Sequence, residues 1–228
     1  KNKTILSTNI KNEEIFLRGL VIARKNVYKQ ASHSVVLIDN FKKEGSEFKW
    51  NGYGSGSLIK RKGKIYGILT NWHVIENGDA FGVCFRPKKG EEVCNEIHEG
   101  HLVNYSKKKD LALLYIQTDR KNLELIKLAQ YKSIEIGDDA HAIGHPSGEL
   151  WTFSTGMIGN IVFKDWKYDE NFKHEANLLQ IQTPINPGNS GGPLLNDDAR
   201  LIGVNVMGSP KSENINFAIA VDEVRKFI

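Results

Sequence analysis

The amino-acid sequence predicts an all-β fold, an antiparallel barrel or sandwich with helices only at its two ends. Short apolar or glycine-containing runs follow one another along most of the chain and are separated by charged turns. Helical spacing of apolar residues occurs only near the ends, and strands and helices do not alternate as they would in a parallel sheet. With 228 residues, of which 40% are hydrophobic, the chain can bury a sizeable core.

The N-terminal part predicts a polar arm followed by one amphipathic helix. Residues 1–12 are rich in Lys and Asn and indicate an irregular arm. From Glu13 onwards an acidic first turn precedes apolar residues at helical spacing, namely Phe16, Leu20, Ala23, Val27 and Ala31. Residues 1–33 are therefore expected to form an arm and a helix outside the β-rich part.

About eleven short strands are expected after this helix, on the evidence of β-branched and glycine-bearing runs bounded by turns. They cover residues 34–38, 54–59, 64–70, 81–86, 101–105, 111–117, 140–143, 152–163, 178–182, 200–206 and 215–220. Residues 222–228 indicate a closing helix. A polar, Leu-rich crossover at 116–132 lies between two β-rich halves, and no internal sequence repeat is visible.

Composition excludes several classes of function. A formal net charge of +4 is too small to indicate nucleic-acid binding, and the short Lys and Arg clusters are typical of solvated turns. No apolar run approaches the roughly 18 residues that span a bilayer, so no transmembrane segment is expected in the sequence shown. Because the first residue is Lys1 and not Met, we expect a processed or trimmed product, which leaves the compartment open.

The two cysteines, Cys84 and Cys94, flank a plausible hairpin whose turn lies near Pro87 to Gly90. Their sulfurs could face each other across the strands and form a bridge. Two reduced thiols packed as small hydrophobic groups are the alternative, and two cysteines are too few to decide the redox compartment.

Residues 181–195 form the stretch around which the remaining chain is organised. Ser190 is flanked by Gly188, Gly191 and Gly192, and prolines bracket the loop on both sides. Small residues let backbone amides approach a reacting oxygen, so this pattern indicates a nucleophilic hydroxyl raised on a tight turn. Taken alone, it could also be an ordinary Gly/Pro loop between two strands.

Two residues outside this loop support the interpretation of Ser190 as a nucleophile. His73 follows an apolar strand, and Asp110 stands at the start of another, so the chain carries His, Asp and Ser in the order of a chymotrypsin-type triad. Imidazole can take the proton of a serine hydroxyl at neutral pH, and a buried carboxylate can fix the imidazole tautomer. Singly, His73 could be a core histidine and Asp110 a turn residue.

Six motifs, in order, resemble the motif series of the HtrA/DegP family of trypsin-like serine proteases. They are Gly54-Ser-Gly-Ser-Leu-Ile, Leu69-Thr-Asn-Trp-His-Val-Ile, Asp110-Leu-Ala-Leu-Leu, Ile143-Gly-His-Pro-Ser-Gly, Ile181-Gln-Thr-Pro-Ile-Asn-Pro-Gly-Asn-Ser-Gly-Gly-Pro-Leu and Ile215-Asn-Phe-Ala-Ile-Ala. The resemblance runs from about Ser34 to Ile228. It implies a trypsin-like protease domain over 34–228, built of two six-stranded antiparallel barrels of chymotrypsin type at about 34–118 and 133–228.

The same resemblance implies a serine endopeptidase without a cofactor, with His73 as general base, Asp110 as the residue that orients it and Ser190 as nucleophile. Its partners would be polypeptide substrates. Relatives of this family commonly assemble as trimers through the N-terminal segment, which implies a homo-oligomer, whereas the alternative is that the helix at 13–31 packs back on its own barrel. The resemblance favours the periplasm or another extracytoplasmic space, although the residues themselves leave the compartment open. A resting or silent protease fold that acts as a peptide-binding, chaperone-like scaffold is the alternative.

The loop also predicts an oxyanion hole and a specificity pocket. The amides of Gly188 and Ser190, with Asn189 between them, are the expected oxyanion donors. An uncharged Asn189 resembles the HtrA arrangement, in which no activating cleavage is needed, so we expect activity to be gated by the conformation of this loop. The pocket is expected to be lined by Ile185, Asn205, Val206 and Met207, with Phe217 and Ala218 behind. None is acidic, which favours cleavage after small or medium aliphatic residues.

Some features depart from the family pattern or suggest other chemistry. His145 stands where the family commonly has Asn, and we expect a surface side chain, with contact to the active-site loops as the alternative. Residues 164–177 are expected to form a long polar and aromatic loop. The peptide-binding PDZ domain usual in this family is absent from the sequence shown. The pairs His98/His101 and His141/His145 have metal-ligand spacing but lack Cys or carboxylate partners in a recognisable motif, so no metal is predicted.

Overall fold

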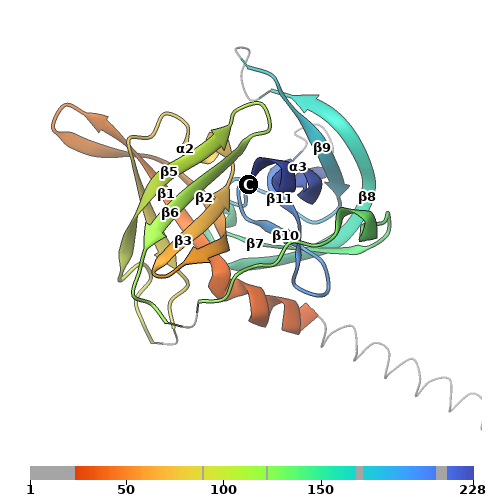
Figure 1. Ribbon diagram of the computed structural model, residues 1–228, viewed down its shortest axis with the longest axis horizontal. Helices are drawn as coiled ribbons and strands as arrows, with labels where there is room; N and C mark the ends of the chain where they lie inside the picture. The colour runs from red at the N-terminus through yellow and green to blue at the C-terminus, as the bar shows by residue number, and fades with distance from the viewer. Residues whose placement is uncertain (1–23, 89, 122, 168–171, 209–214) are drawn as a thin grey trace, which may run out of the picture.

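A computed structural model describes residues 24–228 of the chain, except for residues 89, 122, 168–171 and 209–214. The described residues form two closed antiparallel barrels of six strands each, which lie side by side (Figure 1). This architecture confirms the predicted all-β fold of two six-stranded barrels.

The first barrel contains the strands β1 (Val35–Glu44), β2 (Glu47–Lys62), β3 (Ile65–Thr70), β4 (Ala80–Phe85), β5 (Ile97–Ser106) and β6 (Leu111–Gln117). Its strand order is β1-β2-β3-β6-β5-β4. The short helix α2 (Trp72–Ile75) connects β3 to β4. Branched aliphatic side chains fill the interior, among them the fully buried Ile38, Leu58, Ile68 and Leu114.

The second barrel contains β7 (Asp139–Gly144), β8 (Thr152–Trp166), β9 (His174–Ile181), β10 (Pro193–Leu195), β11 (Leu201–Gly208) and β12 (Asn216–Ala220), and the helix α3 (Val221–Phe227) closes the chain. Its strand order, read from the first strand, is β7-β8-β9-β12-β11-β10. This is the order of the first barrel, so one topology occurs twice although the sequence shows no repeat. In the part of the chain that the structure describes, three single-turn 3-10 helices span Ser32–Ser34, Tyr131–Ser133 and Pro146–Gly148.

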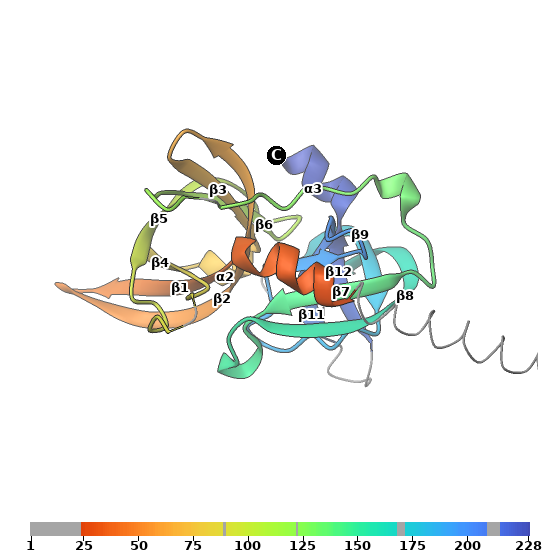
Figure 2. The same ribbon diagram turned by 90° about the horizontal axis from the view of Figure 1, so that it is seen from below.

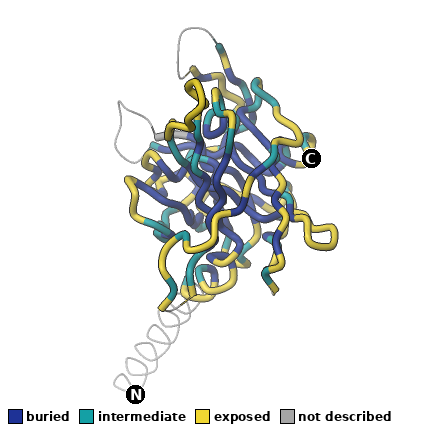
Figure 3. The backbone as a smooth tube through the Cα atoms, turned by 90° about the vertical axis from the view of Figure 1, so that its left-hand side faces the viewer, coloured by how far each residue is buried: buried dark blue, intermediate teal, exposed yellow. Residues whose placement is uncertain are grey.

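The N-terminal helix packs against the second barrel. Residues 24–31 are helical, which agrees with the predicted end of the helix at residue 31, whereas its predicted first part lies outside the described residues. Val27 and Ala31 are buried in the same apolar cluster as the second barrel. Seen from below, the helix crosses the junction between the barrels (Figure 2). Buried residues fill the centre of the molecule and exposed residues follow the outer turns (Figure 3).

Several predicted boundaries were wrong for identifiable reasons. Residues 164–166 and 174–177 are strand and not loop, because β8 and β9 pair as far as Trp166 and His174. Trp166 is buried and its ring stacks on His174 with 5.4 Å between ring centroids. The prediction also missed β10, which has only three residues and directly follows the Gly/Pro loop.

The two cysteines form a disulfide, with their Cα atoms 5.2 Å apart, which decides between the two alternatives left open by the sequence. The predicted geometry was different, because Cys84 on β4 pairs across the ladder with Ile97. Cys94 lies in the loop between β4 and β5, so the bridge fastens this loop to a strand. Among the described helices, none has both the length and the apolar content needed to cross a membrane.

Candidate active site

His73 and Asp110 are in direct contact. His73 lies in α2 and Asp110 lies directly before β6. Nδ1 of His73 is 2.7 Å from Oδ2 of Asp110, and the backbone N–H of His73 donates to Oδ1 at 2.9 Å. The carboxylate of Asp110 is fully buried, whereas the His73 side chain is 22% exposed. A buried carboxylate that binds both the ring and the backbone fixes the orientation of the imidazole while leaving its other edge accessible.

The second barrel holds the loop that carries Asp110. The backbone of Asp110 has φ +53°, a left-handed conformation that is uncommon outside Gly. Nδ1 of His174, at the start of β9, is 2.7 Å from the carbonyl oxygen of Lys107. The ammonium of Lys109 is 3.1 Å from the buried carboxylate of Glu223 on α3. Contacts between the barrels therefore fasten both sides of this turn.

Ser190 lies in the loop before β10, half-buried, with its hydroxyl donating to the carbonyl of Val206 at 3.2 Å. The loop packs against the segment that leads into α2. Gly191 has φ +82°, and a Cβ atom there would meet Oγ1 of Thr70 and lie 3.0 Å from the backbone nitrogen of Asn71. This close approach requires glycine and brings the backbone beside Ser190 to the segment that carries His73.

Residues 186–189 form a tight turn before Ser190. The N–H of Asn189 donates to the carbonyl of Asn186 at 3.0 Å, and Gly188 has φ +101°. Proline followed by a glycine with positive φ is typical of a type II turn. The carbonyl of Pro187 accepts the N–H of Ser147 at 2.8 Å, so the N–H of Gly188, on the opposite side of the same trans peptide, points away from Ser147.

The backbone N–H groups of residues 188–190 differ in whether they already donate a hydrogen bond. The N–H of Asn189 donates to the carbonyl of Asn186 inside the turn, so Asn189 lies between the two expected donors but is not itself available as one. Within the described part of the chain, no backbone carbonyl accepts from the N–H of Gly188 or of Ser190. These two amides are therefore the donors that remain for a bound anion.

The prediction of a surface position for His145 was wrong. His145 is fully buried, and its Nδ1 lies 2.7 Å from the hydroxyl of Ser55 on β2. Its ring also contacts Trp151 edge-on, with 4.8 Å between ring centroids. Burial lowers the pKa of His145 from 6.5 to about 3, so the ring is neutral at physiological pH. Ser55 lies in a motif that the sequence singled out, but a serine in a strand gives no signal of this contact.

The residues expected to line the specificity pocket are only partly described. Ile185 and Val206 are buried, as are Phe217 and Ala218. The side-chain amide of Asn205 donates to the carbonyl of Pro193 at 3.1 Å, and the Asn205 side chain therefore lies in the barrel interior. The backbone of Met207 pairs with that of Phe217, and its side chain lies outside the described residues.

The histidine pairs with ligand-like spacing have separate partners. Both ring nitrogens of His141 have protein partners, Thr155 at 3.0 Å and Asp197 at 2.9 Å, whereas His145 contacts Ser55. Asp139, His141 and Asp197 bring ligand atoms within 4.8 Å of one another, but the hydrogen bonds of His141 give it a structural role. His98 is buried and His101 is 43% exposed.

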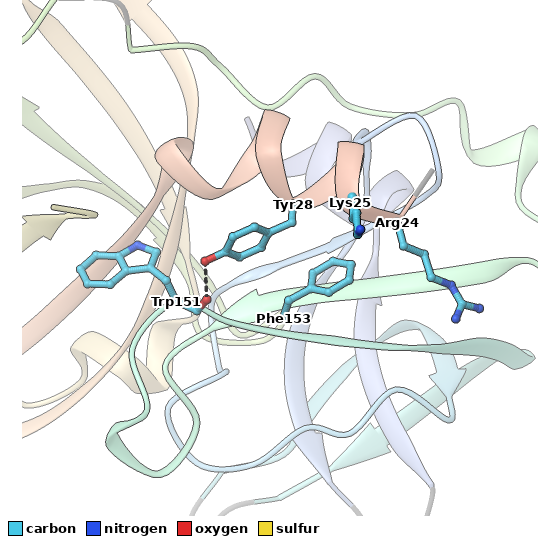
Figure 4. Close-up of a pocket in the computed structure, with 5 residues that line it drawn as sticks. All are labelled: Arg24, Lys25, Tyr28, Trp151 and Phe153. Carbon is cyan, nitrogen blue, oxygen red and sulfur yellow. Dashed lines mark hydrogen bonds between the residues drawn. The ribbon is translucent and has the colours of Figure 1, made fainter. Parts of the chain in front are cut away.

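An apolar pocket of about 520 Å³ lies beneath the N-terminal helix (Figure 4). It is lined by Arg24, Lys25, Tyr28, Trp151 and Phe153. The hydroxyl of Tyr28 donates to the carbonyl of Trp151 at 3.0 Å, and the indole N–H of Trp151 donates to the carbonyl of Val35 at 2.9 Å. Trp151, which also contacts His145, is thus fixed by the N-terminal helix and by β1.

Comparisons with known proteins agree with this architecture. Residues 54–204 match the trypsin-like peptidase domain family. The chain is 31% identical over 221 residues to Protease Do-like 5, chloroplastic, of Arabidopsis thaliana, covering 87% of this chain and 66% of that protein. It is also 31% identical over 227 residues to the serine endoprotease DegS of Haemophilus influenzae, covering 93% of this chain and 62% of that protein.

Solved structures show the same fold. The active form of the Rv3671c protease from M. tuberculosis matches with a TM-score of 0.72 at 20% identity, covering 88% of this chain and 82% of that chain. The serine endoprotease from Yersinia pestis matches with a TM-score of 0.68 at 29% identity, covering 89% and 64%. The chain spans about a third to two thirds of the length of four curated relatives that it matches, Protease Do-like 5 and DegS included. By sequence and fold, the chain belongs to the trypsin-like peptidase domain family and is similar to its HtrA/DegP-type serine proteases.

Proposed function

We propose that this protein is a serine endopeptidase in which Ser190 is the nucleophile, His73 the general base and Asp110 the residue that orients His73. The observation that carries the proposal is the double contact of the buried Asp110 carboxylate with the ring and backbone of His73, at 2.7 and 2.9 Å. The packing of Gly191 against Thr70 and Asn71 supports the placement of Ser190 beside this pair.

In the proposed reaction the Ser190 hydroxyl turns from Val206 towards His73 and attacks the substrate carbonyl carbon. Its proton passes to Nε2 of His73, and the N–H groups of Gly188 and Ser190 bind the resulting oxyanion. The C–N bond then breaks, His73 protonates the leaving amine, and the acyl group remains on Ser190. Water, activated by His73, hydrolyses this ester and restores the enzyme.

Labelling with a fluorophosphonate tests the nucleophile. The wild-type chain is expected to be modified on Ser190, as read by peptide mass spectrometry, and Ser190→Ala is expected to lose the label while keeping its fold. Ser133→Ala, which removes an exposed hydroxyl elsewhere, should label as wild type does. An unlabelled wild type would instead favour the chaperone-like scaffold.

The proposed specificity is for small or medium aliphatic residues before the scissile bond. Buried, uncharged side chains at Ile185, Val206 and Phe217 support it, because an apolar wall disfavours an unpaired charge. Profiling with a peptide library tests it, and a dominant preference for Lys or Arg would contradict it.

We also propose that the conformation of residues 186–189 gates activity without an activating cleavage. The buried, uncharged Asn189 supports this, because it offers no carboxylate for a newly freed N-terminus. Chains starting at Lys1 and longer N-terminal forms should then have similar turnover, and a large difference would contradict the proposal.

The homotrimer proposed from family resemblance is tested by the mass of the protein in solution.

A further inference from the structure

We propose that Ser55 and His145 form a buried relay of hydrogen bonds that holds the carbonyl of Gly188. The relay keeps the turn of residues 186–189 in the orientation in which the N–H of Gly188 can bind the oxyanion. The inference rests on the proposed function, which places the N–H of Gly188 in the oxyanion hole. Ser55 and His145 are positioning residues, because they act through the backbone of Gly188 and do not touch the substrate.

The relay is short and completely enclosed. The Oγ atom of Ser55 lies 2.7 Å from the carbonyl oxygen of Gly188 and 2.7 Å from Nδ1 of His145. Neither side chain has appreciable exposed surface. The backbone N–H of Ser55 also donates to the carbonyl of Ser190 at 2.8 Å. One residue of the first barrel therefore binds two carbonyls of the loop that carries Ser190, those of Gly188 and of Ser190 itself.

The chemistry of the three groups sets the direction of each bond. The Gly188 carbonyl can only accept, so the single hydroxyl proton of Ser55 goes to it. The contact between Ser55 and His145 must then be donated by His145, from a protonated Nδ1. Nε2 of His145 is buried and has no partner among the described residues. A bare lone pair there costs less than an unpaired N–H, which favours the same tautomer.

A second hydrogen bond, separate from the relay, restrains the backbone on the other side of Gly188. The carbonyl of Pro187, on the other side of Gly188, accepts the N–H of Ser147, which is two residues after His145. The short segment from His145 to Ser147 therefore restrains both peptides that flank Gly188. Rotation of the Pro187–Gly188 peptide would turn the N–H of Gly188 out of the oxyanion hole. Rotation of the Gly188–Asn189 peptide would break the turn bond from the N–H of Asn189 to the carbonyl of Asn186, which holds Gly188 in place.

The relay is tested by removing one link at a time. Ser55→Ala deletes the donor to Gly188, and His145→Leu deletes the donor to Ser55. Each is expected to lower kcat on a peptide substrate about tenfold or more with KM changed less than about threefold, because the oxyanion contact is made in the transition state. The double variant should be no worse than the more severe single variant, since both break one chain.

Two buried residues provide matched controls, Ser57 on the strand that carries Ser55 and His141 on the strand that precedes His145. Ser57 is buried on β2, and its hydroxyl has no partner among the described residues. His141 is buried on β7 and binds Thr155 and Asp197, away from the nucleophile loop. Ser57→Ala and His141→Leu should leave kcat near wild type even where thermal stability falls. Equal losses of kcat in the controls and the relay variants would overturn the proposal.

Replacement of His145 by Asn separates hydrogen bonding from packing. An Asn side-chain amide can donate from about the position of Nδ1, so His145→Asn should restore kcat to within about threefold of wild type, unlike His145→Leu. If Asn were as poor as Leu, the donated hydrogen bond would not be the cause.

The tautomer of His145 gives a readout that does not depend on activity. Nitrogen-15 NMR of the wild-type chain at neutral pH should show Nδ1 of His145 protonated and Nε2 unprotonated. The opposite tautomer would overturn the relay even in an active enzyme. A wild type with the expected tautomer but no hydrolysis and no fluorophosphonate labelling would leave the relay standing and overturn the proposed function instead.

Discussion

The carboxylate of Asp110 holds His73 at two points, the ring Nδ1 at 2.7 Å and the backbone N–H at 2.9 Å. The two contacts together fix both the ring orientation and the position of α2 relative to β6. Because the carboxylate is fully buried, both contacts are shielded from water. The geometry of the proposed base is therefore set before any substrate binds.

Replacing Asp110 by Asn tests this role. The amide can no longer accept from both the ring and the backbone in the same way, and it favours the wrong imidazole tautomer. We expect kcat to fall roughly 10⁴-fold, as for the equivalent change in a serine-protease triad. Peptide hydrolysis measures this, with Asp119→Asn on the exposed surface as the control. A loss below about tenfold would contradict the assigned role.

Gly188→Ala tests the turn. At φ +101° an added Cβ would meet the carbonyl oxygen of His145 and lie 2.8 Å from Cε2 of Tyr53, so the turn must shift. We expect kcat to fall about 100-fold or more, because an oxyanion donor moves. Gly63→Ala is the matched control: φ is +62° and no atom lies within 4 Å, so about 1 kcal/mol of stability should be lost with kcat intact.

Burial of His145 predicts loss of stability in acid. Its pKa is lowered to about 3 in the folded chain, whereas the ordinary value is 6.5. Below pH 6.5 the unfolded chain therefore binds a proton that the folded chain does not, so this contribution is complete above pH 6.5 and is lost as pH falls towards 3. At pH 5 the loss is roughly 2 kcal/mol.

Denaturant unfolding of the wild type and His145→Asn at pH 8 and pH 5 measures this contribution. The Asn variant should lose less unfolding free energy between the two pH values, whatever its stability at pH 8. Parallel pH dependence of the two proteins would show that His145 is not the group responsible.

The ion pair of Lys109 and Glu223 is expected to anchor the Asp110 turn. Glu223 is only 3% exposed and its carboxylate also accepts the N–H of Asn177 at 3.2 Å. Glu223→Ala should lower the free energy of unfolding by about 1 to 3 kcal/mol, because it leaves buried polar groups unpaired. Thermal or denaturant unfolding measures the change. The exposed pair of Lys64 and Asp119 is the comparison, and Asp119→Ala should change stability little.

The strands that a sequence can predict are those with a buried face. Residues 111–117 were predicted with the observed bounds, because a run of apolar residues coincides with a strand inside the barrel. The part of β1 from Asp39 to Glu44 was missed. From Lys42 onwards the strand pairs only with β2, as an exposed two-stranded ribbon whose charged side chains carry no burial pattern. Its pairing is made by backbone hydrogen bonds, which are nearly independent of side-chain identity.

The sequence by itself determined the all-β class, the three residue types of the proposed triad and their order, because glycine, proline and apolar spacing are local properties that a short segment reveals. Only the tertiary structure decided how the parts meet. It places the carboxylate of Asp110 against His73, and it buries His145 behind Ser55 and Gly188 where a surface position was expected. These contacts join residues 37, 90 and 133 positions apart. The first follows from the pairing of β3 with β6 inside the first barrel, and the other two follow from how the two barrels pack, which no local pattern records.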